Sequence, residues 1–85
     1  MLFRSPFLNY LMRTSSGGDV VRIGDPMPNG ERPMGAFQIP PSVFRQYAAP
    51  GMTNPLNPLH NAVAFIRFVQ DRYGHPANMP ELLGR

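Results

Sequence analysis

The chain has 85 residues, of which 11 are proline and 8 are glycine. These 19 positions are about 22% of the chain, against a usual share of about 12%, so long uninterrupted helices must be few. The length suits one small domain or part of a larger one. The sequence has no cysteine, which excludes a disulfide scaffold, a thiolate metal site and a cysteine nucleophile.

All eight basic side chains are arginine, and they outnumber five acidic ones to give a net charge of +3. The arginines are spread evenly and form no basic stripe with interleaved aromatic residues, so we expect no nucleic-acid partner. The longest apolar stretch falls far short of the roughly 20 residues that a membrane span needs. We therefore expect no membrane span.

The first predicted element is a short amphipathic helix over residues 6–13. Ser5 is a good N-cap, and Pro6 suits the first helical position. A spacing of four predicts an apolar stripe that is formed by Phe3, Phe7 and Leu11, with Leu8 and Met12 beside it. The run Ser15-Ser16-Gly17-Gly18 is expected to break this helix.

A long Gly/Pro-rich loop is predicted at 17–34, where only residues 20–23 favour an extended piece. A loop of this length inside a compact domain is usually functional or disordered. Both interpretations, a loop that borders a cleft and a flexible linker, stay open.

Two further helices are predicted, near 41–48 and 58–73. Pro41 starts the first, where Val43, Phe44 and Tyr47 form one face, and Pro50-Gly51 is expected to end it. Asn57 and Pro58 start the second, and Gly74 ends it. Its predicted core-facing stripe consists of Leu59, Ala62, Val63, Ile66, Val69 and Tyr73. Residues 80–83 are expected to add one terminal turn.

Most chemistries that depend on a recognisable motif are absent from this sequence. The two histidines, His60 and His75, have no carboxylate at ligand spacing, so no metal site and no cofactor are expected. No Gly-x-Ser-x-Gly elbow or phosphate-binding glycine loop occurs. Carboxylate chemistry remains, and it needs an acid whose pKa is raised by an apolar wall. Asp71, on the polar face of the last helix, is expected to be solvated.

Two segments resemble a known family. Residues 33–51 read PMGAFQIPPSVFRQYAAPG, and residues 57–74 read NPLHNAVAFIRFVQDRYG. The first resembles the Gly-Leu-Met-Gln-type motif and the Pro-x-x-Phe helix of the soluble lytic transglycosylase domain. The second is similar to the helix that follows, with its Asn-Pro start, internal Asn and Tyr-Gly stop. The resemblance covers about residues 11–80 and is greatest to versions embedded in tailed-phage tape measure proteins.

The resemblance implies a mainly α, lysozyme-like fold and cleavage of the β-1,4 bond between N-acetylmuramic acid and N-acetylglucosamine in peptidoglycan. In the family one glutamate acts first as acid and then as base, and a 1,6-anhydro product results. Here Ser15 occupies the position of that glutamate and is not expected to be active. Ser16, Gln38, Asn61 and Tyr73 match positions that line the glycan site. Asn61 could also be structural, and Tyr73 could be a core residue.

The resemblance further implies that residues 1–85 are a single partial domain, N-terminally truncated relative to the family, whose last helix exposes an apolar stripe. We expect peptidoglycan glycan strands as partner, together with the rest of a phage tail protein. The expected location is a phage virion tail or a bacterial cell envelope. Alternatives are a noncatalytic glycan-binding or structural remnant and an unrelated interaction domain. Asp25 and Glu31 are candidates to replace the missing acid.

Overall fold

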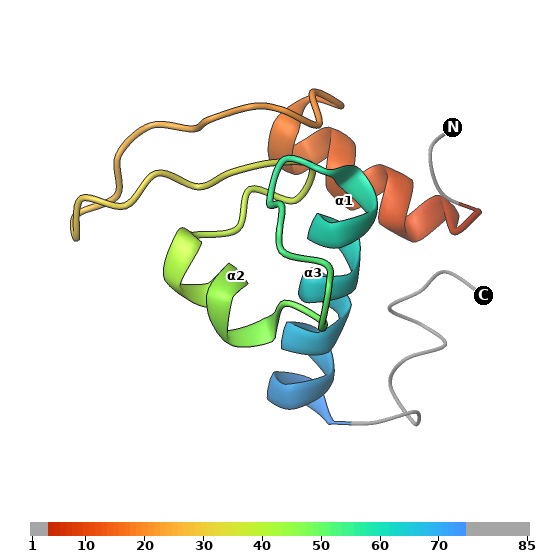
Figure 1. The fold of residues 1–85 in the computed structure, drawn as a ribbon. Helices are drawn as coiled ribbons and strands as arrows, with labels where there is room; N and C mark the ends of the chain where they lie inside the picture. The colour runs from red at the N-terminus through yellow and green to blue at the C-terminus, as the bar shows by residue number, and fades with distance from the viewer. Residues whose placement is uncertain (1–3, 75–85) are drawn as a thin grey trace.

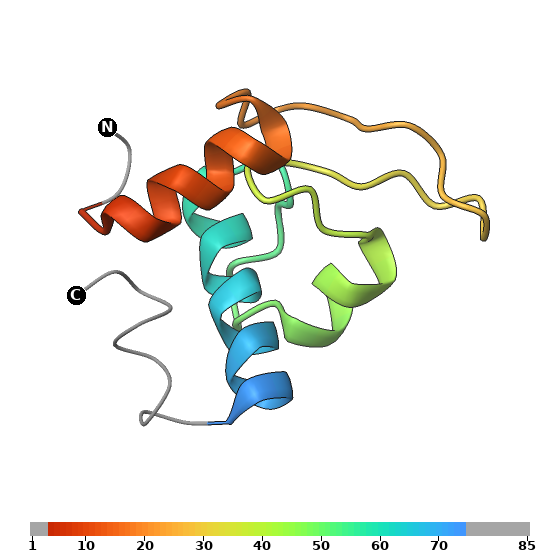
Figure 2. The same ribbon diagram turned by 180° about the vertical axis from the view of Figure 1, so that it is seen from behind.

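The computed structural model describes residues 4–74 and has a mainly α architecture. Its helices are α1 (Pro6–Ser16), α2 (Pro41–Tyr47) and α3 (Pro58–Tyr73). Within residues 4–74 there is no strand, and only two isolated antiparallel bridges join extended residues. Helix α1 lies across the N-terminal half of α3, and α2 packs beside α3 (Figures 1 and 2). The segment between α1 and α2 extends away from the helices as an arm.

Helix α1 begins where the sequence predicts and ends later. The Ser5 hydroxyl accepts a hydrogen bond from the backbone N–H of Leu8 at 3.1 Å, which confirms the predicted N-cap. The helix ends within the predicted run Ser15-Ser16-Gly17-Gly18, but it continues to Ser16, beyond the predicted end at residue 13. Serine in the last turn is tolerated since the Ser16 hydroxyl donates to the carbonyl of Met12 at 3.0 Å. Gly17 ends the helix in the left-handed conformation, with φ of +70°.

The buried face of α1 differs from the predicted stripe. Its buried residues are Leu8, Asn9, Met12 and Ser16. Phe7 and Leu11 are half-buried, and Phe3 lies outside the described residues. Two polar side chains thus share the inward face, and a pattern of apolar spacing cannot detect them. Burial of Asn9 is supported by a bond of 3.0 Å from its amide to the carbonyl of Ser5.

Helices α2 and α3 largely confirm the predicted elements. Helix α2 starts at Pro41 and buries Phe44, but it ends at Tyr47, before the predicted Pro50-Gly51 stop. Helix α3 spans the predicted residues, and the Asn57 side chain accepts hydrogen bonds from the backbone N–H groups of Leu59 and His60 at 2.9 and 3.2 Å. The expected terminal turn at 80–83 lies outside the described residues.

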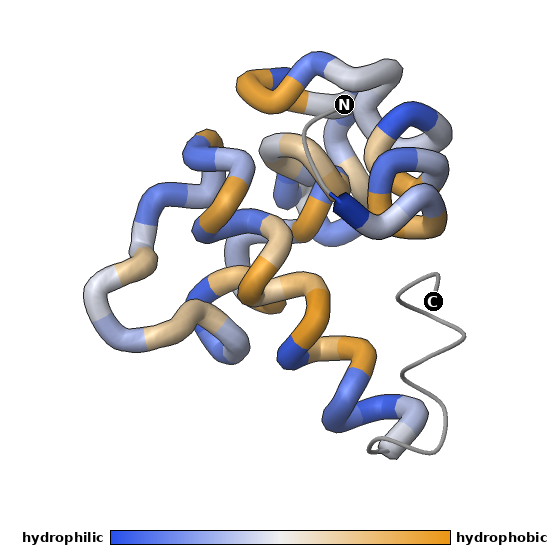
Figure 3. The backbone as a smooth tube through the Cα atoms, turned by 90° about the vertical axis from the view of Figure 1, so that its right-hand side faces the viewer, coloured by the Kyte–Doolittle hydropathy of each residue, from blue (hydrophilic) through white to orange (hydrophobic). Residues whose placement is uncertain are grey.

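The predicted core-facing stripe of α3 is right in its middle and wrong at its ends. Ala62 and Val69 are buried, whereas Leu59 is 58% exposed and Tyr73 is 63% exposed. Between them Val63 and Ile66 are half-buried. The helix therefore does not expose the expected apolar stripe, and its exposed apolar side chains are limited to the two end residues, Leu59 and Tyr73. Along the tube of α3 apolar stretches lie in the middle, and its C-terminal end is hydrophilic (Figure 3).

One apolar cluster joins the helices to the segment between α1 and α2. It combines residues from α1, α2 and α3 with residues from the 34–39 segment. Its buried members are Leu8, Met12, Ala36, Phe37, Ile39, Phe44, Ala62 and Ala64. Burial of such side chains contributes about 25 cal/mol per Å² of apolar surface removed from water. The 34–39 segment is therefore part of the core.

The 17–34 segment is tied to itself along its length. Met27 N–H donates to the Glu31 carbonyl at 2.7 Å near its tip, and Gly24 N–H donates to the Pro33 carbonyl at 2.8 Å further along. A bridge pairs Ile23 with Met34 at its base. These bonds make the segment a folded-back arm, which differs from the flexible linker that the sequence left open.

Residues 34–39, which we call the 34–39 turn, close a tight loop against α3. Met34 and Ile39 exchange two backbone hydrogen bonds of 3.0 Å each. Gly35 has φ of +82°, and a Cβ there would collide with the carbonyl oxygen of Pro55 and the amide of Asn61. This position therefore requires glycine for both conformation and space.

Replacement of Gly35 and Gly30 by alanine separates these two requirements. Both glycines have similar positive φ values, +82° and +88°, but a Cβ at Gly30 would meet no atom within 4 Å. We expect Gly30→Ala to cost about 1 kcal/mol from backbone strain, and Gly35→Ala about 3 kcal/mol because overpacking is added. Urea denaturation of both variants measures the difference. Equal losses would contradict the close approach of Pro55 and α3 at Gly35.

Candidate functional site

Asn61, on the first turns of α3, holds the 34–39 turn in place. Its side chain is fully buried, with an exposed fraction of 0%. Its amide donates to the carbonyls of Met34 and Pro55 at 3.0 and 2.9 Å, and its carbonyl oxygen accepts from the backbone N–H of Phe37 at 2.8 Å. All three bonds go to backbone groups. Asn61 therefore holds the turn against α3.

Gln38 occupies the last position of the turn before Ile39. Its φ of +52° is the one positive value of a non-glycine residue in residues 4–74, and such backbone strain is typical of functional positions. Its side-chain amide donates to the carbonyls of Arg22 and Gly35 at 3.1 and 2.9 Å. A Cβ at Gly24 would collide with the side-chain oxygen of Gln38. Gln38 thus fixes the arm to the turn.

The end of α1 is connected to Gln38 through two successive turns. Asp19 N–H donates to the Ser16 carbonyl at 3.3 Å, and Arg22 N–H donates to the Asp19 carbonyl at 3.2 Å. The carbonyl of Arg22 then accepts from Gly35 N–H at 2.9 Å as well as from Gln38. Ser15 is exposed at this end, and Ser16 is buried.

An apolar groove lies beside Gln38, between the turn, α2 and α3. Its volume is about 250 Å³. Phe37 and Phe65 stack along it, with ring centroids 4.6 Å apart and planes 7° from parallel. The lining residues are Phe37, Gln38, Ile39, Pro40, Val43, Phe65, Phe68 and Arg72.

Tyr73 lies apart from the other predicted site residues. It ends α3, whereas Asn61 lies 12 residues earlier, about 18 Å along the helix axis. With 63% of its side chain exposed, Tyr73 does not occupy the core position that the sequence left open as an alternative. The structure thus joins Gln38 and Asn61 to the same turn, links Ser16 to Gln38 only through the turns that follow α1, and places Tyr73 elsewhere.

Glu31, a candidate to replace the missing acid, serves as a cap for α2. Pro40 precedes this helix and supplies no side-chain cap. The Glu31 carboxylate instead accepts from the backbone N–H and the hydroxyl of Ser42 at 2.7 and 2.9 Å, and from the Asn29 amide at 2.9 Å. The N–H of Ser42, and next its hydroxyl, hold the pKa of Glu31 below its ordinary value. A general acid needs the opposite shift.

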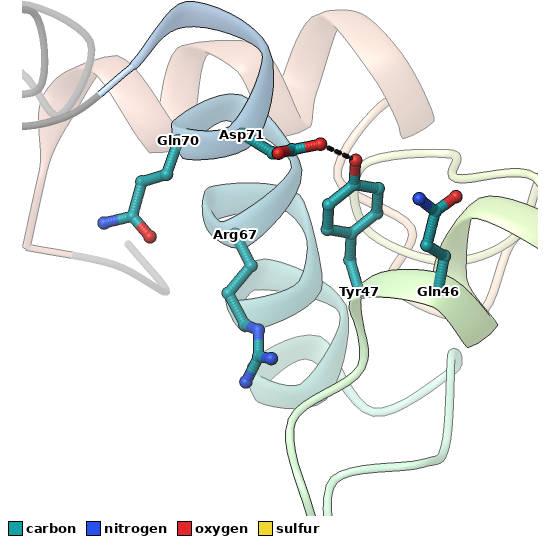
Figure 4. A pocket seen from close by; sticks show the side chains of 5 residues that line it. All are labelled: Gln46, Tyr47, Arg67, Gln70 and Asp71. Atoms are coloured by element: carbon teal, nitrogen blue, oxygen red, sulfur yellow. Dashed lines mark hydrogen bonds between the residues drawn. The ribbon is translucent and has the colours of Figure 1, made fainter.

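Sequence reasoning missed this cap and a second contact, between α2 and α3. The Tyr47 hydroxyl donates to the Asp71 carboxylate (Figure 4). This bond to Asp71 raises the pKa of Tyr47 above its ordinary value. Asp71 is exposed, as expected of a solvated residue, but it also holds α2 against α3. Of the two contacts only the first had a signal in the sequence, namely a helix start that lacks its own capping side chain.

Metal-binding clusters and membrane-spanning helices are both absent from residues 4–74. In residues 4–74 no group of three or more histidine, aspartate or glutamate side chains could hold a metal ion. No helix in this part of the chain has the length and apolar character needed to cross a membrane.

Comparison with known proteins finds a bacterial relative. The chain is 37% identical over 78 residues to the "Uncharacterized protein YqbO" of Bacillus subtilis (strain 168), an alignment that covers 88% of this chain. The chain spans 5% of the length of that protein. No family model matches the chain, and no solved structure matches it.

The pH dependence of stability is expected to reflect the Glu31 cap. Because folding lowers the pKa of Glu31 below 4.5, the ionised carboxylate favours the folded state. Its contribution is present above that pH and is lost as the pH falls below it. Glu31→Gln should therefore reduce the loss of thermal stability between neutral and acidic pH. Thermal unfolding across this range measures it, with Asp25→Asn as control. An unchanged pH profile in Glu31→Gln would contradict the cap.

Proposed function

We propose that this chain is a lytic transglycosylase-like segment of a peptidoglycan-acting protein that binds glycan strands and lacks the catalytic acid. The supporting observation is the arrangement around Gln38. Its backbone has a positive φ, its side chain is held by the carbonyls of Arg22 and Gly35, and it lines an aromatic groove. The sequence resemblance places the family's glutamine at this residue. A mainly α chain agrees with the lysozyme-like fold that the resemblance implies.

Neither Asp25 nor Glu31 replaces the acid that cleavage requires. Ser15 has a hydroxyl that does not ionise in the working range of pH, so it cannot act as a general acid of this kind. Hydrogen bonds from Ser42 lower the pKa of Glu31, and Asp25 is exposed. The noncatalytic, glycan-binding alternative is therefore favoured over cleavage for the chain as it stands. The proposed setting is a phage tail or a bacterial cell envelope.

Binding to insoluble peptidoglycan tests this function directly. We expect the chain to sediment with purified peptidoglycan and to be released by soluble N-acetylglucosamine oligosaccharides. Cellulose, which has the same β-1,4 linkage without N-acetyl groups, is the control matrix and should retain little protein. Failure to bind peptidoglycan, or equal binding to cellulose, would show that the glycan-binding proposal is wrong.

Restoring the acid tests whether Ser15 occupies the position of the family's glutamate. Ser15→Glu should release 1,6-anhydromuropeptides from peptidoglycan, detected by mass spectrometry, whereas the unchanged chain and Ser15→Gln should release none. The expected difference is about 10²- to 10⁴-fold, the usual contribution of a general acid. No product from Ser15→Glu would mean that the acid does not belong at this position.

A further inference from the structure

A second, polar hollow lies between the end of α2 and the last two turns of α3. Its volume is about 580 Å³, and its lining residues are Gln46, Tyr47, Arg67, Gln70 and Asp71. Every lining side chain carries a hydrogen-bonding group. The apolar groove beside Gln38 shares none of these residues.

One part of the hollow is fixed by contacts within the protein. The Tyr47 hydroxyl donates to Asp71 (Figure 4), and the Tyr47 ring meets Phe68 edge-on, with centroids 5.5 Å apart and planes at 83°. These contacts hold a carboxylate and an aromatic ring in a set orientation. A carboxylate that accepts one hydrogen bond retains further acceptor sites.

The other part of the hollow offers hydrogen-bonding capacity that the protein does not use. Within residues 4–74 the side chains of Gln46, Arg67 and Gln70 make no hydrogen bond or ion pair. Arg67 lies four residues before Asp71, a spacing at which such residues commonly pair on a helix, but Tyr47 occupies Asp71 instead. Arg67 and Gln70 extend from α3, and Gln46 extends from α2 (Figure 4).

The combination of groups indicates the chemistry of the ligand. Two amides supply donors and acceptors, Arg67 supplies donors, and Asp71 supplies an acceptor. The positive and negative side chains balance, which disfavours a simple anion. A sugar with neighbouring hydroxyl groups and an N-acetyl amide offers both donors and acceptors to such a set, and its C–H face can lie on an aromatic ring.

We propose that this hollow is a second carbohydrate-binding site, which takes an N-acetylated amino sugar. The choice of a glycan rests on the proposed function, whereas the hydrogen-bonding character of the hollow does not. Arg67 and Gln70 bind the hydroxyl and carbonyl oxygens of the sugar, Asp71 accepts from a hydroxyl, and Gln46 closes the opposite side.

Titration of the isotope-labelled full chain with an N-acetylglucosamine oligosaccharide, followed by NMR, tests the site. The side-chain amide signals of Gln46 and Gln70 should shift and saturate. Arg67→Ala should weaken this response about tenfold, because it removes a charge-assisted hydrogen bond to the sugar. Arg13→Ala, which removes an exposed arginine of α1, should leave the response unchanged.

The signals also separate this proposal from the proposed function. Shifts at Gln38 without shifts at Gln46 and Gln70 would overturn the second site and leave glycan binding intact. Shifts at Gln46 and Gln70 alone would support the second site and contradict the role of Gln38. No shift at either place would overturn both. If inorganic phosphate produces the same shifts as the sugar, the hollow is an anion site formed by Arg67, and the carbohydrate proposal is wrong.

Discussion

The hydrogen bonds of Asn61 are the constraint on which the rest of this structure depends. A fully buried side-chain amide is tolerated only when its polar atoms are paired, since each unpaired donor or acceptor costs about 1–3 kcal/mol. Asn61 pairs with three backbone groups from two separate segments, at Met34, Phe37 and Pro55. It thereby sets the position of the 34–39 turn relative to α3. The close approach at Gly35 follows from the same arrangement, because a side chain there would displace the amide.

The position of the 34–39 turn determines the conformation and the contacts of Gln38. With Gly35 held against α3, the backbone reverses within four residues and Gln38 takes a positive φ. Both of its side-chain hydrogen bonds then join the turn to the arm. Two carboxylates also have structural roles, because Glu31 caps α2 and Asp71 accepts a hydrogen bond from Tyr47. Glu31 thereby fixes the start of α2, and Asp71 fixes the end of α2 against α3. The pKa of Glu31 is lowered, whereas proton donation requires a raised pKa.

The sequence predicted those features whose causes lie within a few residues. Ser5 and Asn57 cap their helices through bonds to N–H groups two or three positions away, so both helix starts were predictable. The buried polar residues of α1 were not predictable. The side chains of Asn9 and Ser16 donate hydrogen bonds to backbone carbonyls one turn earlier, so they can be buried at positions where apolar spacing predicts no core residue. Most of the contacts that arrange the site join residues 11 to 27 positions apart. No local pattern encodes such pairings in a single sequence, and the resemblance pointed to Gln38 and Asn61 without showing that one is strained and the other buried.

Helix α2 separates the groove from the hollow, and this limits how a glycan strand could use both. Pro40 and Val43 face the groove, whereas Gln46 and Tyr47 line the hollow at the other end of the helix. The seven residues of α2 span about 10 Å, and Tyr47 of the hollow contacts Phe68 of the groove edge-on. A glycan strand bound at both surfaces, as proposed, would have to follow α2 over this length. The Glu31 cap at one end of this helix and the Asp71 contact at the other hold it in place, so these two acids fix the spacing of the two surfaces.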